Sequence, residues 1–134
     1  MAVERPVPTP DHESAEFWRR VGAHAMALQR CADCGTVRFY PRALCPQCLG
    51  ERADWRPVSG RGTIYSYTVC HRPASEAFAA ATPYIVALVD LDEGVRLLSN
   101  LIDCAPAQAR VGMPVTLVYE DVAKELALYK FRPA

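Results

Sequence analysis

Residues 31–48 read CADCGTVRFYPRALCPQC and hold two Cys-x-x-Cys pairs separated by ten residues. Two residues between paired cysteines let both sulfur atoms face one ion from a tight turn, and two such turns complete a tetrahedral site. The spacing therefore predicts one metal site; its ligands are Cys31, Cys34, Cys45 and Cys48. Because four protein ligands leave no position for water, we predict a structural metal whose binding free energy contributes to folding.

Zinc is the ion that we expect in this site, which makes the segment a zinc ribbon. Iron in a rubredoxin-like site has the same four thiolate ligands and stays open as the less favoured alternative. Gly35 follows the first pair and predicts a positive φ where the chain leaves that turn. Cys70 and Cys104 lie in or beside predicted strands, and we interpret them as small buried apolar side chains.

The segment before the cysteines has the pattern of a helix from Pro10 to Leu28. Thr9 is placed to cap it, with Pro10 in the first helical position. The apolar residues of the predicted helix recur at spacings of three and four, which is one helix face. That face comprises Phe17, Val21, His24 and Leu28. Gly22 interrupts the pattern, so two short helices are the alternative.

After the cysteines, residues 51–61 predict a connector rich in turn formers, and from Gly62 the pattern changes to strands. The predicted strands are Thr63–His71, Tyr84–Leu91, Val95–Leu101, Val115–Glu120 and Glu125–Phe131. Five strands with a short helical turn at 104–110, between the third and the fourth, match the plan of an OB-fold barrel. The predicted fold is mainly β with an N-terminal α-helix. We divide it into a helical segment (1–28), a zinc ribbon (29–58) and a five-stranded OB-fold barrel (59–134).

Composition and charge exclude several classes of protein. Fifteen Lys and Arg balance fifteen Asp and Glu among 134 residues, whereas a dedicated nucleic-acid binder normally carries a basic excess. No stretch has the apolar length of a membrane helix, and residues 1–14 lack the apolar core of a secretory signal. We therefore expect a cytoplasmic protein that does not associate with a membrane. In a reducing compartment a disulfide framework is not expected from the six cysteines.

A catalytic constellation is missing from the sequence. It contains no Gly-x-Ser-x-Gly, no Walker A loop and no Gly-x-Gly-x-x-Gly. The three histidines, His12, His24 and His71, are scattered along the chain. A nucleophilic role for Cys70 or Cys104 is a disfavoured alternative, because neither has a visible general base. We therefore predict that the chain is not an enzyme by itself.

Several short motifs in a fixed order resemble a known family. They are LQRCADCG at 28–35, FYPR at 39–42, SGRGTIYSYT at 59–68 and PYIVALV at 83–89. In this order they are similar to the zinc-ribbon OB-fold proteins long catalogued as a domain of unknown function and found beside acyl-CoA enzymes. The resemblance covers residues 10–134 and implies a helix, a rubredoxin-like ribbon and an OB barrel.

The resemblance also implies a function. Such proteins are accessory subunits of thiolases, thiolase-like aldolases, acyltransferases and some acyl-CoA hydratases, and the catalytic residues belong to the partner. The expected contact surfaces are the N-terminal helix, the 39–42 stretch and the 72–82 loop. Arg38 and Arg42 are candidate contacts for a CoA phosphate, since arginine suits bidentate phosphate binding. Ordinary surface arginines are the alternative.

A single-stranded nucleic-acid-binding ribbon and OB protein is the alternative function. OB strands two and three usually present stacking aromatic and basic residues for this purpose. Here these strands offer only Tyr84 and Arg96. The sequence therefore favours an accessory subunit over a nucleic-acid-binding protein.

Overall fold

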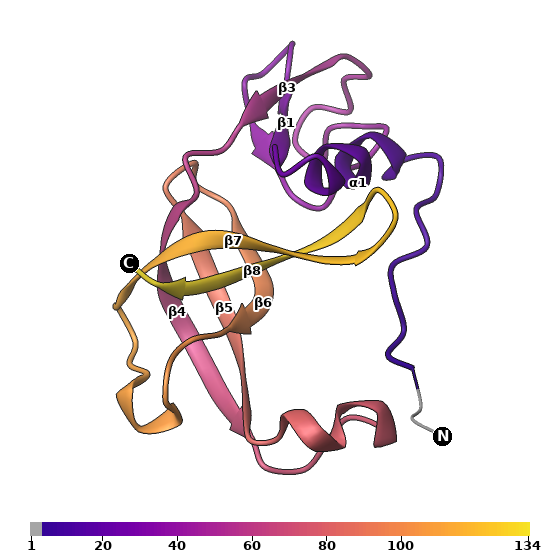
Figure 1. Cartoon of the computed structure of the whole chain (residues 1–134). Coiled ribbons are helices and arrows are strands. Elements are labelled where there is room, and N and C mark those ends of the chain that lie inside the picture. The colour runs from indigo at the N-terminus through magenta and orange to yellow at the C-terminus, as the bar shows by residue number, and fades with distance from the viewer. Residues whose placement is uncertain (1–3) are drawn as a thin grey trace.

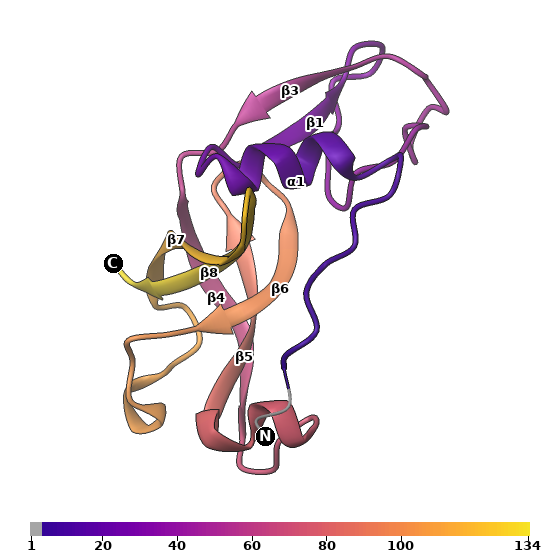
Figure 2. The ribbon, with the colours of Figure 1, turned by 45° about the vertical axis from the view of Figure 1, so that its right-hand side comes forward.

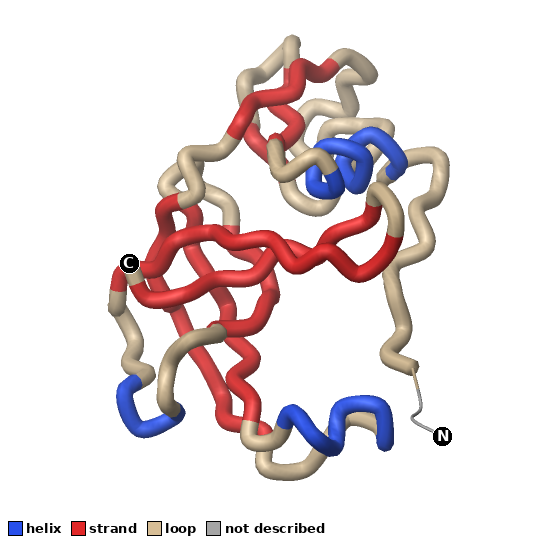
Figure 3. Tube along the Cα trace, in the orientation of Figure 1, coloured by secondary structure: helices blue, strands red, loops and turns tan. Residues whose placement is uncertain are grey.

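The computed structural model describes residues 4–134, which form a small three-stranded sheet, one α-helix and a closed barrel (Figure 1). The helical segments are α1 (Ala15–Gly22) and the 3₁₀ turns η1 (Glu76–Ala81) and η2 (Pro106–Gln108). The strands are β1 (Ala27–Cys31), β2 (Val37–Arg38), β3 (Ala53–Pro57), β4 (Arg61–Cys70), β5 (Tyr84–Leu91), β6 (Arg96–Leu101), β7 (Pro114–Ala123) and β8 (Leu126–Pro133). Figure 3 shows how short the helical segments are beside the strands. Within this part of the chain no helix is long and apolar enough to span a bilayer.

The barrel closes in the order β4-β5-β6-β8-β7, which confirms the predicted five-stranded OB-fold. All its neighbours are antiparallel except β6 and β8, which meet in parallel at Leu101 and Phe131. Burial alternates along β5, so that Ile85, Ala87 and Val89 point into the core and their neighbours do not. This period of two is what a strand with one buried face requires.

The predicted helix over 10–28 was too long at both ends, because α1 begins at Ala15 and ends at Gly22. Before it, the Asp11 carboxylate accepts hydrogen bonds from the Ser14 amide and hydroxyl, which holds residues 11–14 in a turn. The predicted cap at Thr9 is therefore wrong. After it, His24 has a φ of 59°, which breaks the helix, and Leu28 belongs to β1.

The ribbon sheet has the order β2-β1-β3, and β3 lies inside the segment 51–61 that we expected to be a connector. β3 pairs antiparallel with β1 along its whole length, from Ala53 opposite Cys31 to Pro57 opposite Ala27. Exposed and half-buried residues alternate in β3 over only a few positions before Pro57, so the turn formers around it conceal the strand in the sequence. The ribbon strands thus run from Ala27 to Pro57, and the barrel strands begin at Arg61.

An aromatic cluster joins the helix, the ribbon and the barrel into one core. The ring of Phe17 on α1 lies 5.8 Å from Phe39 and 5.9 Å from Tyr129 of β8. Trp18 stacks on Tyr129, and its indole N–H donates to the Tyr40 hydroxyl at 2.8 Å. Figure 2 shows the β7–β8 hairpin reaching up to α1. The ribbon is therefore held on the barrel by packed side chains as well as by the connection from β3 to β4.

Candidate metal centre

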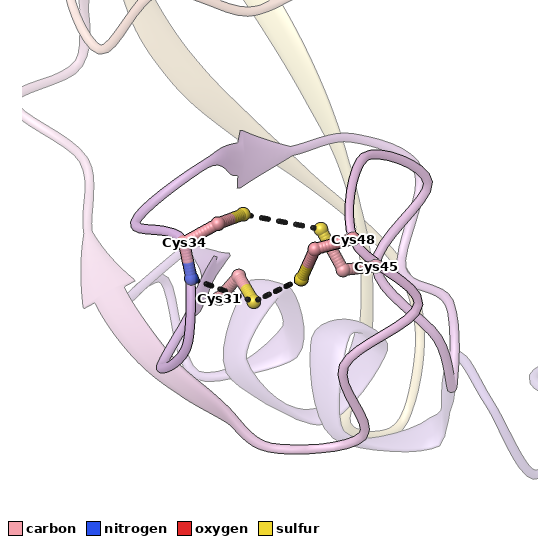
Figure 4. Close-up of side chains that lie close together, drawn as sticks. All are labelled: Cys31, Cys34, Cys45 and Cys48. Carbon is pink, nitrogen blue, oxygen red and sulfur yellow. Dashed lines mark hydrogen bonds between the residues drawn. The ribbon is translucent and has the colours of Figure 1, made fainter.

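The four predicted cysteine ligands point toward one another in the ribbon (Figure 4). Their Sγ atoms all lie within 4.8 Å of one another. Cys31 Sγ is 3.5 Å from Cys48 Sγ, and Cys34 Sγ is 3.6 Å from Cys45 Sγ. A tetrahedral ion with metal–sulfur bonds of about 2.3 Å sets sulfur atoms about 3.8 Å apart. The spacing of the four sulfur atoms therefore fits a single tetrahedral metal ion.

Two turns of the same design carry the two cysteine pairs. In the first, the Gly35 amide donates to the Cys31 carbonyl at 3.0 Å. In the second, the Leu49 amide donates to the Cys45 carbonyl at 2.9 Å. Both residues that follow the pairs are left-handed, with φ of 76° at Gly35 and 63° at Leu49. The positive φ predicted at Gly35 is confirmed, and the matching strain at Leu49 was not foreseen.

Backbone amides point at the sulfur atoms. The amides of Cys34, Gln47 and Gly50 donate to Cys31, Cys45 and Cys48 Sγ, at 3.5, 3.4 and 3.4 Å. Such donors favour the ionised thiolate, the form of cysteine that binds metals. A Cβ at Gly50 would lie 3.2 Å from Cys48 Sγ and 2.4 Å from a carboxylate oxygen of Asp33. Glycine at this position lets the chain pass close to the cluster.

The thiols influence one another strongly because they are so close. The Thr36 hydroxyl and amide lower the pKa of Cys34 to about 6. The Gly50 amide lowers the pKa of Cys48, but the neighbouring thiols Cys31 and Cys34 outweigh it and the pKa is raised to about 12. Four thiolates at these distances repel one another unless a cation compensates their charge. The donor set thus suits a divalent ion that would be bound by four thiolates.

Two family models match consecutive parts of the chain. Residues 27–54 match "ChsH2, rubredoxin-like zinc ribbon domain" and residues 55–120 match "ChsH2, C-terminal OB-fold domain". The chain is also 35% identical over 115 residues to a "DUF35 domain-containing scaffold protein" of Methanothermobacter thermautotrophicus, with 84% of this chain and 86% of that protein covered. The chain belongs to the DUF35 family.

Other relatives of this DUF35 chain have names of enzyme subunits. It is 41% identical over 130 residues to a "Probable enoyl-CoA hydratase alpha subunit" of Thermomonospora curvata, but spans only 40% of that protein's length. It is 33% identical over 112 residues, or 77% of this chain and 72% of the relative, to "Benzoylsuccinyl-CoA thiolase subunit BbsA" of Thauera aromatica. A solved structure named "Ltp2-ChsH2(DUF35) aldolase" matches with a TM-score of 0.85 and 40% identity, over 94% of this chain and 98% of that one.

The structure places the two candidate phosphate contacts of this DUF35 chain differently. Arg38 is only 5% exposed; it donates to Gln29 Oε1 at 3.1 Å and to the Arg42 carbonyl at 2.9 Å. Its remaining Nη1 is buried without a hydrogen-bond partner among the described residues. The Arg42 side chain is exposed and lies over the Tyr40 ring. Arg42 is thus far more exposed than Arg38, although both side chains line one small pocket. The contact of either arginine with a phosphate stays a prediction.

The three surfaces that we expected to contact a partner also differ in how exposed they are. The rings of Phe39 and Tyr40 pack on Phe17 and are half-buried, so most of the 39–42 stretch faces inward. The apolar side of α1 is likewise buried by the chain's own core. Much of the 72–82 loop is exposed. The chain's own core thus takes up the apolar side of α1 and most of the 39–42 stretch, while the outer side of α1 stays exposed. Contact of these three surfaces with a partner stays a prediction.

The remaining histidines and cysteines stand apart from the four-cysteine cluster. His24 lies 2.7 Å from an Asp121 carboxylate oxygen and stacks on Tyr119, which ties the end of α1 to the β7–β8 hairpin. His71 is exposed at the end of β4. Cys70 and Cys104 are half-buried, which is less than the full burial that we expected. His24 thus has a structural role, and His71, Cys70 and Cys104 are not grouped with the four-cysteine cluster.

Proposed function

We propose that this DUF35 chain is a non-catalytic scaffold subunit of an acyl-CoA enzyme complex, and that a thiolase-like partner carries the reaction. The observation that carries the proposal is the closed set of four thiolates, which leaves no position for a substrate or a water molecule. Relatives named as scaffold proteins and as thiolase or hydratase subunits support the same assignment.

Zinc is the ion that we propose for the site. The match of residues 27–54 to a rubredoxin-like zinc ribbon supports it, as do sulfur–sulfur distances near those of a tetrahedral thiolate site. When bound, the ion supplies cross-linking between the two cysteine turns. The chain's own residues then hold the ribbon in place, through Trp18, Phe17 and Tyr129.

The partner that we propose is a folded subunit of the thiolase type, with acyl-CoA near the shared interface. The relative named as a thiolase subunit supports a partner of the thiolase type, and the matching structure named as an aldolase supports a role as one subunit of an enzyme. Arg42 is the residue that we propose for a contact with a CoA phosphate, because its guanidinium is exposed. The compartment that we propose is the cytoplasm, in keeping with free cysteines and a neutral net charge.

Single-stranded nucleic acid is a weaker candidate ligand. The basic residue on the relevant strands, Arg96, is paired with Asp90 at 2.7 Å and lies over the Tyr65 ring at 3.3 Å. The charge of Arg96 is thus neutralised within the chain, and the face of Tyr65 is covered by the guanidinium. Neither side chain is free to bind a phosphate or to stack on a base. Titration with a labelled oligonucleotide at low salt should show no micromolar, salt-sensitive binding.

The proposal is tested by reconstitution. The tagged chain is co-expressed with candidate thiolase-type acyl-CoA enzyme subunits from its own genome, and turnover is compared for the partner alone, the chain alone and the complex. We expect the complex to form and the chain alone to be inactive. A partner that is monodisperse and fully active without the chain would overturn the proposal, as would turnover by the isolated chain.

A further inference from the structure

The two cysteine turns of the ribbon differ at one equivalent position. Both have the same backbone hydrogen bonds and both end in a left-handed residue, but this residue is Gly35 in the first turn and Leu49 in the second. A leucine in this conformation is strained because its Cβ crowds the backbone, whereas glycine adopts it freely. The ribbon thus keeps a leucine where the local backbone favours glycine.

Packing within the chain does not explain this leucine. Leu49 is 70% exposed and Leu44 is 46% exposed, so the second turn presents both side chains to the outside. Together with Pro46 they line a groove of about 700 Å³, which is also lined by residues 11–13, Arg42 and Ala43. A strained residue that gains so little burial points to an interaction outside the chain.

The charged side chains at the groove indicate what would fit it. Asp11 uses Oδ1 to accept from the Ser14 amide, and Glu13 uses Oε2 to accept from the Ala43 amide. The second oxygen of each carboxylate has no hydrogen bond within residues 4–134. Arg42 lines the same groove, but its Nη1 donates to the Pro41 carbonyl and its guanidinium lies over the Tyr40 ring. The two carboxylates outnumber this one cation, so a basic group on a partner would complement the groove.

We infer that the second cysteine turn docks the catalytic subunit of the complex. The subunit inserts an apolar side chain beside Leu44 and Leu49, and an adjacent lysine or arginine meets Asp11 and Glu13. This inference rests on the proposed function, and it assigns the docking surface within it. Strain accepted at Leu49 in the free chain is compensated when the side chain becomes buried in the complex.

The test compares affinities for the catalytic subunit recovered in the reconstitution and then purified separately. Leu49→Asn keeps a residue that tolerates the left-handed conformation and removes the apolar contact. We expect the thermal midpoint and the metal content of the free chain to be unchanged or raised. The dissociation constant of the complex should rise about tenfold or more.

Two further variants sharpen this test. Leu98 on β6 is also 59% exposed but lies in the barrel, so Leu98→Asn is the matched control and should change the affinity less than twofold. Glu13→Gln keeps an acceptor for the Ala43 amide and removes the charge. It should weaken the salt dependence of the association rate.

The outcomes separate the inference from the function on which it rests. If Leu49→Asn binds like the unmodified chain, the docking surface is wrong while the scaffold function stands. If Leu49→Asn melts earlier or loses metal, Leu49 has a structural role and the inference fails. If Leu49→Asn abolished a homodimer of the free chain and left the complex intact, the surface would join two copies of this chain, and the inference would equally fail. If the unmodified chain binds no acyl-CoA enzyme subunit, the proposed function fails first.

Discussion

Gly22 at the end of α1 lies directly against the backbone carbonyl of Glu125, in the turn between β7 and β8. A Cβ at Gly22 would stand 2.2 Å from that carbonyl oxygen and 2.8 Å from its carbon. Gly22→Ala therefore forces the helix off the hairpin, and backbone on both sides leaves little room to adjust. We expect a loss of about 2 kcal/mol in the free energy of unfolding, measured by urea denaturation.

Alanine has the better helix propensity, by about 1 kcal/mol, and this effect acts in the opposite direction. An unchanged or raised stability of Gly22→Ala would show that propensity outweighs the close contact. Ala23→Ser is the control, because Ala23 is the exposed neighbour at the end of the same helix. It should change the stability by less than about 0.5 kcal/mol.

Metal removal should unfold the ribbon. Structural zinc contributes on the order of 10–16 kcal/mol in small zinc-binding peptides, as much as the whole stability of a typical domain. We therefore expect Cys45→Ser, at a fully buried position, to lose the bound metal and to lower the thermal midpoint sharply. Elemental analysis and a melting curve check both expectations.

Thiol titration provides the control for this prediction. Of the six free cysteines, the metal protects four, so a thiol reagent should modify only Cys70 and Cys104 in the native protein. All six should react in denaturant with a chelator. Cys104→Ser should keep the metal. Rapid native modification of all six thiols would refute a closed site.

Most of the fold could be predicted from the cysteine spacing and the strand pattern, because each depends on residues that are close in the sequence. Two Cys-x-x-Cys turns bring four sulfur atoms together without help from the rest of the chain. Alternation of buried and half-buried residues marks β5, whose ends were predicted to the residue. Such signals lie within a few neighbouring positions and can be found in a single sequence.

The errors occur where distant contacts decide the structure. The helix stops at Gly22, since it meets the β7–β8 turn and since His24 takes a left-handed conformation. β3 forms because β1 offers it a partner, although its own alternation of exposed and half-buried residues is too short to predict a strand. Arg38 is buried by a turn that folds over it, which no charge count reveals. Tertiary packing overrides local preference at each of these places.

Alkaline conditions should destabilise the fold through Tyr129. Burial raises the pKa of Tyr129 from 10.0 to about 12, with a smaller effect of the Tyr40 hydroxyl. As the pH rises, the unfolded chain loses its phenolic proton first, so the folded state is penalised. The stability that depends on neutral Tyr129 is complete below pH 10 and is lost between about pH 10 and 12. The loss should be on the order of 2 kcal/mol.

Tyr129→Phe isolates this effect, because phenylalanine keeps the ring contacts with Phe17 and Trp18. The variant should resemble the unmodified chain at pH 8 and lose less stability by pH 11, as followed by urea denaturation at a series of pH values. Parallel pH profiles for the two proteins would assign the alkaline transition to another group.

Substitution of the buried Arg38 should lower the stability of the fold, whereas substitution of the exposed Arg42 should affect ligand binding. Arg38→Ala removes a buried side chain and two hydrogen bonds, and should lower the free energy of unfolding by about 2 kcal/mol. Arg38→Met keeps the apolar stem and removes a buried charge, so it should lose less than the alanine variant.

Arg42→Ala removes an exposed side chain and should change the stability by less than about 0.5 kcal/mol. In the reconstituted complex it should raise the KM for acyl-CoA about tenfold and leave kcat unchanged, since a phosphate contact is the same in the ground state and the transition state. An unchanged KM would remove Arg42 from the CoA site. A fall in kcat with an unchanged KM would show that Arg42 affects the reaction step on the partner and not the binding of acyl-CoA.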